Sequence, residues 1–142
     1  MSLSRFVRSV VVASEGEPIA NVARKMRDAR VGSVVVTRSD RPIGIVTDRD
    51  LALRVVAEER SATTTRVADV VTYGPFVLQE SDEIETAVRG MREHGVRRLP
   101  VVDADGKLVG MVSADDLVML FGRELAALAD SVEESTDAYE SR

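Results

Sequence analysis

GSVVVTRSDRPIGIVTDRDL at residues 32–51 and RRLPVVDADGKLVGMVSADDL at residues 97–117 are two versions of one pattern. Each has an apolar strand, a polar turn and a second apolar strand that ends in Gly-x-x-Thr/Ser-x-x-Asp-Leu. The match continues upstream at an offset of 65 residues, which relates Ile19, Val22 and Met26 to Ile84, Ala87 and Met91. Because an internal repeat defines the folding unit, the sequence predicts two copies of one small unit.

Each copy is expected to fold in the order β-α-β-β-α. The first copy has predicted strands at 10–12, 33–37 and 43–46 and predicted helices at 17–30 and 48–59. The second has predicted strands at 76–78, 99–102 and 108–112 and predicted helices at 82–94 and from 114 onward. A strand–helix–strand step followed by a hairpin gives a mixed three-stranded sheet with helices on one face. The predicted fold class is α/β (α+β), with two pseudo-symmetric β-α-β-β-α units packed through their three-stranded sheets.

The repeat also sets the predicted domain boundaries. A unit of about 60 residues is near the lower limit for independent stability, so the two units are expected to share an apolar interface. We predict a first domain at 8–60, a linker at 61–66, a second domain at 67–129 and an acidic, disordered tail at 130–142. The last helix of the second domain carries an apolar stripe of Leu117, Leu120, Phe121, Leu125 and Leu128.

The composition argues against several classes of protein. The chain has no cysteine and one histidine, so neither a metal site nor a thiol or Ser-His catalytic arrangement is expected from one chain. No apolar run approaches ~18 residues and no signal-peptide pattern opens the chain, so a cytoplasmic protein without a membrane partner is expected. The net charge of −5 resides in residues 124–142, which hold six acids and one base. The balanced remainder argues against a nucleic-acid surface.

Thr47 and Ser113 each stand where an apolar strand meets a helix, and Asp50 and Asp116 follow three residues later. This spacing is typical of a capping box, in which a hydroxyl and an acid each bond to the other residue's backbone amide. The same spacing suits a ligand site, because free amides at a helix start attract phosphate. An Asp one turn later can accept hydrogen bonds from both hydroxyls of a ribose. Both interpretations stay open on these residues alone.

A glycine precedes each hydroxyl by three residues, Gly44 in the first copy and Gly110 in the second. Capping does not require these glycines. A ligand that approaches the strand backbone closely would require them, because glycine has no side chain to obstruct it. The two glycines therefore favour the ligand interpretation, although a glycine in a strand can also mark a bulge.

The signature and its duplication resemble a tandem pair of CBS (cystathionine beta-synthase) domains, also called a Bateman module. The resemblance rests on GIVTDRDL at 44–51, GMVSADDL at 110–117 and GVRRLPVVD at 95–103. It covers about residues 8–122, which is nearly the whole chain before the acidic tail.

The resemblance implies a regulatory protein that binds an adenosine ligand in clefts between the two units. The implied ligands are AMP, ADP or ATP, and less often NAD or S-adenosylmethionine, with no cofactor or metal required. It also implies a homodimer, in which four CBS units form a flat disc. The implied binding residues are Asp50 and Asp116 for ribose hydroxyls, Thr47 and Ser113 for phosphate or ribose, Ile45 and Met111 for adenine, and Arg97 and Arg98 for phosphate.

The two copies differ at the implied phosphate residues. The positions in the first copy that correspond to Arg97 and Arg98 hold Gly32 and Ser33, so the two clefts are expected to be unequal. The leading hypothesis is a non-enzymatic nucleotide sensor that acts on an unknown protein effector. The alternative is a ligand-independent dimerisation scaffold in which the signature residues serve only as caps. A hydrolase is not favoured, because the sequence supplies no general base.

Overall fold

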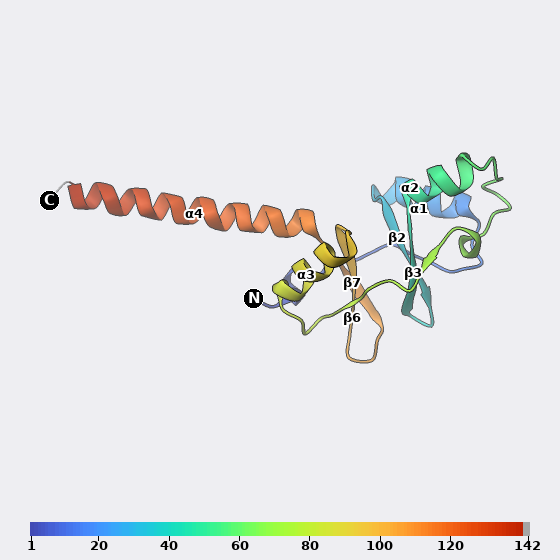
Figure 1. Ribbon diagram of the computed structural model, residues 1–142, viewed down its shortest axis with the longest axis horizontal. Helices are drawn as coiled ribbons and strands as arrows, with labels where there is room; N and C mark the ends of the chain where they lie inside the picture. Colours follow the sequence, from blue (N-terminus) through green and yellow to red (C-terminus); the bar gives the residue numbers. More distant parts are fainter. Residues whose placement is uncertain (141–142) are drawn as a thin grey trace.

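Two small mixed sheets organise the chain, and the computed structural model describes residues 1–140 (Figure 1). The first sheet has the order β1-β2-β3-β4, and the second has the order β5-β6-β7. In each sheet the first pair of strands is parallel and the following hairpin is antiparallel. The strands are β1 (Val12–Ala13), β2 (Ser33–Arg38), β3 (Arg41–Thr47), β4 (Thr72–Tyr73), β5 (Leu78–Gln79), β6 (Arg98–Val102) and β7 (Leu108–Ser113).

Helices connect the parallel strands and follow each hairpin, so the predicted order β-α-β-β-α is present twice. The helices are α1 (Ile19–Ala29), α2 (Asp48–Leu51), α3 (Ile84–His94) and α4 (Ala114–Glu140). Helix α2 continues as a π-helical turn, η2 (Ala52–Val56), and two 3-10 turns, η1 (Leu3–Phe6) and η3 (Val67–Asp69), complete the list. No helix in the described residues combines the length and the apolarity needed to cross a bilayer.

Each unit has its own apolar core. One side chain from each turn of α1 and α3 faces its sheet, which is the spacing that the sequence shows. The first core contains Ile19, Val22, Met26, Val34, Val36, Val46, Val55, Val67 and Val70, and the second contains Leu3, Leu78, Ile84, Ala87, Met91, Leu99, Val101, Val112 and Leu117.

The outer edge of each sheet is covered by a segment from elsewhere in the chain. Strand β4, which follows the predicted linker, pairs with β3 of the first sheet. The N-terminal segment lies on the second sheet, where Arg8 and Met111 exchange backbone hydrogen bonds of 3.0 and 2.9 Å. Leu3 of the same segment is fully buried in the second core. Uncovered strand edges are prone to unwanted pairing, and this exchange of segments covers the β3 edge of the first sheet and the β7 edge of the second.

The exchange explains Gly44 and Gly110. A Cβ at Gly110 would overlap the carbonyl oxygen of Arg8 and lie 2.6 Å from Val7 Cγ1. A Cβ at Gly44 would overlap Val71 Cγ2 and lie 2.9 Å from the carbonyl oxygen of Thr72. The close approach predicted for a ligand is therefore made by a neighbouring strand, and the sequence-based interpretation of these glycines was wrong.

We expect Gly110→Ala to lower the free energy of unfolding by about 1–3 kcal/mol, the usual cost of overpacking. The extra methyl would push the N-terminal segment away from β7. Denaturant unfolding measures the change. Gly122→Ala is the control, since nothing lies within 4 Å of that position, and it should stabilise the helix by about 0.5–1 kcal/mol. An unchanged stability for Gly110→Ala would contradict the strand-packing role.

Helix α4 differs from the sequence-based expectation. The acidic composition predicted a disordered tail at 130–142, but the helix runs without interruption from Ala114 to Glu140 and projects away from the sheets (Figure 1). Residues 124–140 contain no Gly or Pro and are rich in Ala, Leu and Glu, which are strong helix formers. The last two residues of the predicted tail, 141–142, lie outside the described residues.

Candidate functional site

A first cleft of about 380 Å³ opens where the signature of the first unit faces the second unit. Ile45, Thr47 and Asp50 form one wall from the end of β3 and the start of α2. The remaining lining residues come from β4, the segment after it and the second unit: Thr72, Tyr73, Gly74, Pro75, Phe76, His94, Val96, Arg98 and Leu99. The volume is within the range of about 300–1,000 Å³ that small-molecule sites occupy.

A second cleft of about 420 Å³ is its pseudo-symmetric counterpart. Met111, Ser113 and Asp116 form the wall that corresponds to Ile45, Thr47 and Asp50 of the first cleft. The opposite wall comes from the N-terminal segment, the end of α1, the loop after it and the start of β2: Arg8, Ser9, Val10, Val11, Ala29, Arg30, Val31, Gly32 and Ser33. Six of the eight predicted binding residues thus fall into two matching sets, one in each cleft.

Thr47 and Asp50 form a complete capping box. The amide of Asp50 donates to Thr47 Oγ1 at 3.1 Å, and the amide of Thr47 donates to Asp50 Oδ2 at 2.9 Å. The other carboxylate oxygen, Oδ1, lies 3.8 Å from Arg54 Nε, and the side chain of Asp50 keeps 19% of its surface exposed. The capping interpretation is therefore realised here, while one oxygen of Asp50 is engaged only by a long ion pair at the cleft.

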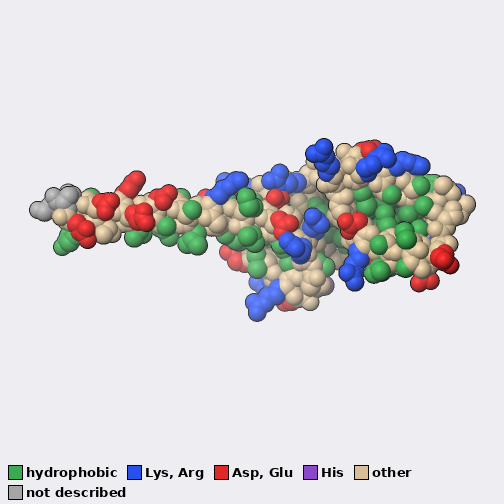
Figure 2. All heavy atoms as spheres, turned by 90° about the horizontal axis from the view of Figure 1, so that it is seen from above, with side chains coloured by type: hydrophobic (Ala, Val, Ile, Leu, Met, Phe, Trp, Pro, Cys, Tyr) green, Lys and Arg blue, Asp and Glu red, His purple; other side chains and the backbone are tan. Residues whose placement is uncertain are grey.

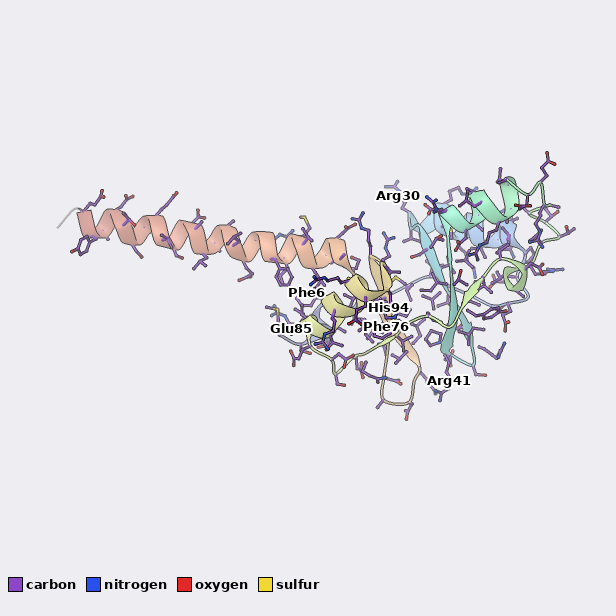
Figure 3. All side chains as sticks on the ribbon, in the orientation of Figure 1. Phe6, Arg30, Arg41, Phe76, Glu85 and His94 are labelled. Atoms are coloured by element: carbon purple, nitrogen blue, oxygen red, sulfur yellow. The ribbon has the colours of Figure 1, made fainter. Side chains whose placement is uncertain are left out.

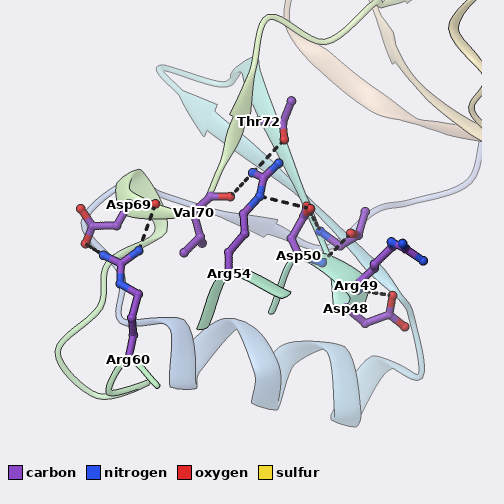
Figure 4. A network of polar contacts seen from close by, with 9 residues as sticks. Asp48, Arg49, Asp50, Arg54, Arg60, Asp69, Val70 and Thr72 are labelled. Atoms are coloured by element: carbon purple, nitrogen blue, oxygen red, sulfur yellow. Dashed lines mark hydrogen bonds and ion pairs between the residues drawn. The ribbon is translucent and has the colours of Figure 1, made fainter. Parts of the chain in front are cut away.

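Arg54 is a residue that the sequence-based reasoning missed. Its Nη1 donates to the carbonyl of Val70 at 2.7 Å and to Thr72 Oγ1 at 3.0 Å (Figure 4). It therefore ties Asp50 to the segment that carries β4, which forms a wall of the first cleft. The available signal was its position four residues after an acid on a helix, the spacing of an ion pair.

Ser113 and Asp116 make only half of the corresponding box. The amide of Asp116 donates to Ser113 Oγ at 3.2 Å, but the carboxylate of Asp116 accepts from Arg8 Nε at 2.6 Å. The side chain of Arg8 is 75% exposed, and exposed ion pairs contribute little to stability. The acid of the second cleft is therefore held by a weak partner from the N-terminal segment.

The two predicted phosphate residues have different surroundings. Arg98 lines both clefts and the space between them, so the arginine of the second unit faces the signature of the first. Arg97 lines the space between the clefts and forms an ion pair with Asp115 of its own unit. The structure thus brings Arg98 to Thr47 and Asp50, whereas the side chain of Arg97 is bound to another acid.

A CBS domain model matches the chain twice, at residues 4–57 and at residues 67–123. The chain belongs to the CBS domain family. This membership confirms the resemblance inferred from the duplicated signature.

Individual relatives agree with this assignment. The uncharacterized protein MK0525 of Methanopyrus kandleri is 38% identical over 114 residues, which are 80% of this chain and 58% of that protein. The CBS domain-containing protein YhcV of Bacillus subtilis is 34% identical over 110 residues, 78% of this chain and 77% of YhcV. A solved structure of the CBS domain protein PAE2072 from Pyrobaculum aerophilum, complexed with AMP, superimposes with a TM-score of 0.75 and 30% identity, covering 82% of this chain and 90% of that one.

The second cleft of this CBS pair contains a backbone conformation that side chains disfavour. Arg30, the residue after α1, has φ 55° and ψ 46°, whereas the corresponding residue after α3 is Gly95 with φ 62°. A left-handed conformation costs a residue with a Cβ roughly 1–2 kcal/mol, and strain of this kind gathers at functional sites. Arg30 and Arg8 give the second cleft basic residues that the repeat alignment did not predict.

The first cleft instead has an aromatic wall. The rings of Phe76 and His94 are stacked, with centroids 4.4 Å apart and planes inclined by 25° (Figure 3). His94 Nδ1 lies 2.9 Å from the carbonyl of Gly90, which fits the predicted position at a helix end. Tyr73, another lining residue, donates its hydroxyl to Glu15 at 2.6 Å, and this bond, with that from Arg38, lowers the pKa of Glu15. The two clefts are unequal, as expected, but Arg97 and Arg98 do not make the difference, because Arg98 lines both clefts and Arg97 lines only the space between them.

Proposed function

We propose that this CBS pair is a non-enzymatic regulatory module that binds an adenosine nucleotide in the clefts between its two units. The observation that carries the proposal is the first cleft, where Thr47 and Asp50 of one unit face Arg98 of the other across about 380 Å³. A ribose at Asp50 and a phosphate at Arg98 would use charge-assisted hydrogen bonds from both units. The AMP complex of PAE2072, which has the same fold, supports this class of ligand.

Binding across the cleft gives a route to regulation. A ligand that contacts both units favours whichever relative placement of the units holds it better, in proportion to its differential affinity. The change in the relative placement of the units then alters the surface that a protein effector contacts, or the surface that contacts the second copy in a disc of four CBS units. AMP, ADP and ATP are the proposed ligands, with NAD and S-adenosylmethionine as further members of the same chemical class.

Equilibrium titration with AMP, ADP, ATP, NAD and S-adenosylmethionine tests the proposal. Isothermal calorimetry should detect saturable binding of at least one of them, and mass spectrometry of ligand released from the purified protein should identify an adenosine compound. Absence of binding at millimolar concentration of all five would favour the ligand-independent scaffold. Consumption of the bound nucleotide would favour an enzyme.

Arg30→Gly should have opposite effects on stability and on binding. The substitution removes the left-handed strain, so the free energy of unfolding should rise by about 1 kcal/mol. It also removes a guanidinium from the wall of the second cleft, so nucleotide affinity there should fall. Denaturant unfolding and calorimetry on the same sample give both values. A stability gain with unchanged binding would limit Arg30 to a structural role.

A further inference from the structure

Helix α4 leaves the body of the molecule soon after it begins. Leu117 is its last buried residue and Leu120 is half-buried, whereas every residue from Phe121 to Glu140 is exposed. At about 1.5 Å per residue, these 20 residues extend roughly 30 Å. In proteins most of the stability of a helix comes from the packing of an apolar face and not from helix propensity. The exposed part of α4 therefore lacks the packing that normally stabilises a helix.

From Val118 onward, α4 carries large, exposed apolar side chains at regular intervals. Val118, Phe121, Leu125, Leu128, Val132 and Tyr139 have exposed fractions between 45% and 84%. They follow one another in alternating steps of three and four residues, with Ser135 in the one remaining position. This is the heptad spacing of a coiled coil. Figure 2 shows apolar and acidic side chains exposed together along the projecting helix. We call the six apolar residues and Ser135 the seam.

The charges of α4 lie away from the seam. Asp130, Glu133, Glu134, Asp137 and Glu140 all occupy outer positions of the heptad, b, c and f. The positions that flank the seam from Gly122 onward hold small residues, apart from one acid: Gly122, Glu124, Ala129, Ser131, Thr136 and Ala138. Two copies of the helix can therefore approach along the seam with only Glu124 as a charged flanking residue.

The polar side chains near the seam do not oppose pairing. The hydroxyls of Ser131, Ser135 and Thr136 donate to the carbonyls four residues earlier, at 3.1, 2.8 and 3.0 Å. Their donors are therefore satisfied within the helix, so they need no partner across an interface. Burial of this part of the seam leaves no hydroxyl proton without an acceptor.

We propose that α4 pairs through the seam with α4 of a second copy of this chain, as a two-stranded coiled coil. Heptad-spaced apolar residues pack well against a helix with the same spacing, and a second copy of this chain supplies one. The outer acids point away from such a partner, whereas a basic partner would have to leave the seam to reach them. The pairing does not depend on nucleotide binding.

Light scattering after size-exclusion chromatography of the full chain tests the proposal. Leu125→Glu/Leu128→Glu places two charges in the seam, and Ala126→Glu/Ala127→Glu places the same two charges on the outer face. We expect the wild type and the outer variant to have the mass of a dimer, and the seam variant to dissociate at lower dilution than the outer variant. A monomeric wild type would overturn the proposal, and so would equal masses of the two variants at every dilution combined with equal amide protection of residues 121–140.

Hydrogen exchange at residues 121–140 isolates the helix from any contact between the CBS bodies. In the wild type, amide protection of this segment should increase with protein concentration, and the seam variant should lose that increase. Protection that is independent of concentration would reject the pairing even if the chain is a dimer. The exchange rates of the two cores serve as the control that both variants are folded.

The salt dependence of binding distinguishes a second copy of the chain from other possible partners of the seam. Residues 118–140 hold six acids and one base, so two paired helices repel each other and added salt, which screens that repulsion, should tighten the dimer. A basic protein or a cationic vesicle would instead bind more weakly at high salt. Two results would contradict the proposal: a dimer whose dissociation constant rises with added salt, or a chain that binds cationic vesicles more tightly than it binds a second copy.

Discussion

Asp50→Asn should weaken nucleotide binding in the first cleft by about 10-fold to 100-fold. A hydrogen bond to a charged group contributes roughly 1.5–3 kcal/mol, and the amide loses the charge and one of the two acceptor oxygens that a ribose would use. The amide keeps one oxygen, which can still accept from the Thr47 amide as Asp50 Oδ2 does at 2.9 Å. The capping box should therefore survive and stability should change little. Calorimetric titration and thermal unfolding of the same variant measure the two effects.

Asp50→Ala is the companion to that experiment. It removes both the charge and the carboxylate half of the capping box, so the loss of affinity should be joined by a loss of about 1 kcal/mol in unfolding free energy. If Asp50 served only as a cap, Asp50→Asn would bind nucleotide as the wild type does. Asp116→Asn provides a control at the other cleft, because it should weaken the second site and leave the first unchanged.

Leu3→Ala should lower the free energy of unfolding by about 2–3 kcal/mol, the lower part of the range for a buried Leu. Leu3 is fully buried in the second core, and its short segment can detach in response, which limits the cost. The matched control is Leu53→Ala, which makes the same deletion where the side chain is 51% exposed. That variant should change stability by less than about 0.5 kcal/mol. Denaturant unfolding gives both values.

The location of the damage tests the exchange of segments. Hydrogen exchange of Leu3→Ala should show faster opening in residues 78–117, which are far away in sequence, and little change in residues 19–55. Faster opening in the nearer unit would contradict the packing of the N-terminal segment on the second core. Equal stability for Leu3→Ala and Leu53→Ala would have the same meaning.

Local patterns in the sequence predicted the repeated part of the fold. The alternation of apolar strand, turn and apolar strand appears directly in β2, β3, β6 and β7, and the helical spacing of Ile19, Val22 and Met26 appears in α1. The sets Ile45, Thr47, Asp50 and Met111, Ser113, Asp116 then fall in matching clefts because the units are repeats. Their roles in binding stay predictions.

The remainder depended on contacts between distant residues. Leu3 and β4 belong to segments of only a few residues, too short to show a period, and each pairs with a strand far along the chain. Arg8 therefore could not be placed beside Asp116 from the sequence. The positions of Gly44 and Gly110 correctly indicate a close approach to the backbone. The sequence cannot say whether a ligand or a strand makes that approach, because both require a residue without a side chain. In α4 the acidic composition of residues 130–142 predicts disorder, whereas the spacing of Val132 and Tyr139 continues the apolar stripe of the helix.

The exchange of segments has a consequence for how this chain can be divided. A cut in the predicted linker at 61–66 would leave the first fragment without β4, and it would leave the second fragment without Leu3 and Arg8. Neither piece would contain all the residues that close its own sheet, although each contains one full repeat. The two halves are interlocked, so the smallest part that can be transplanted into another protein is the pair.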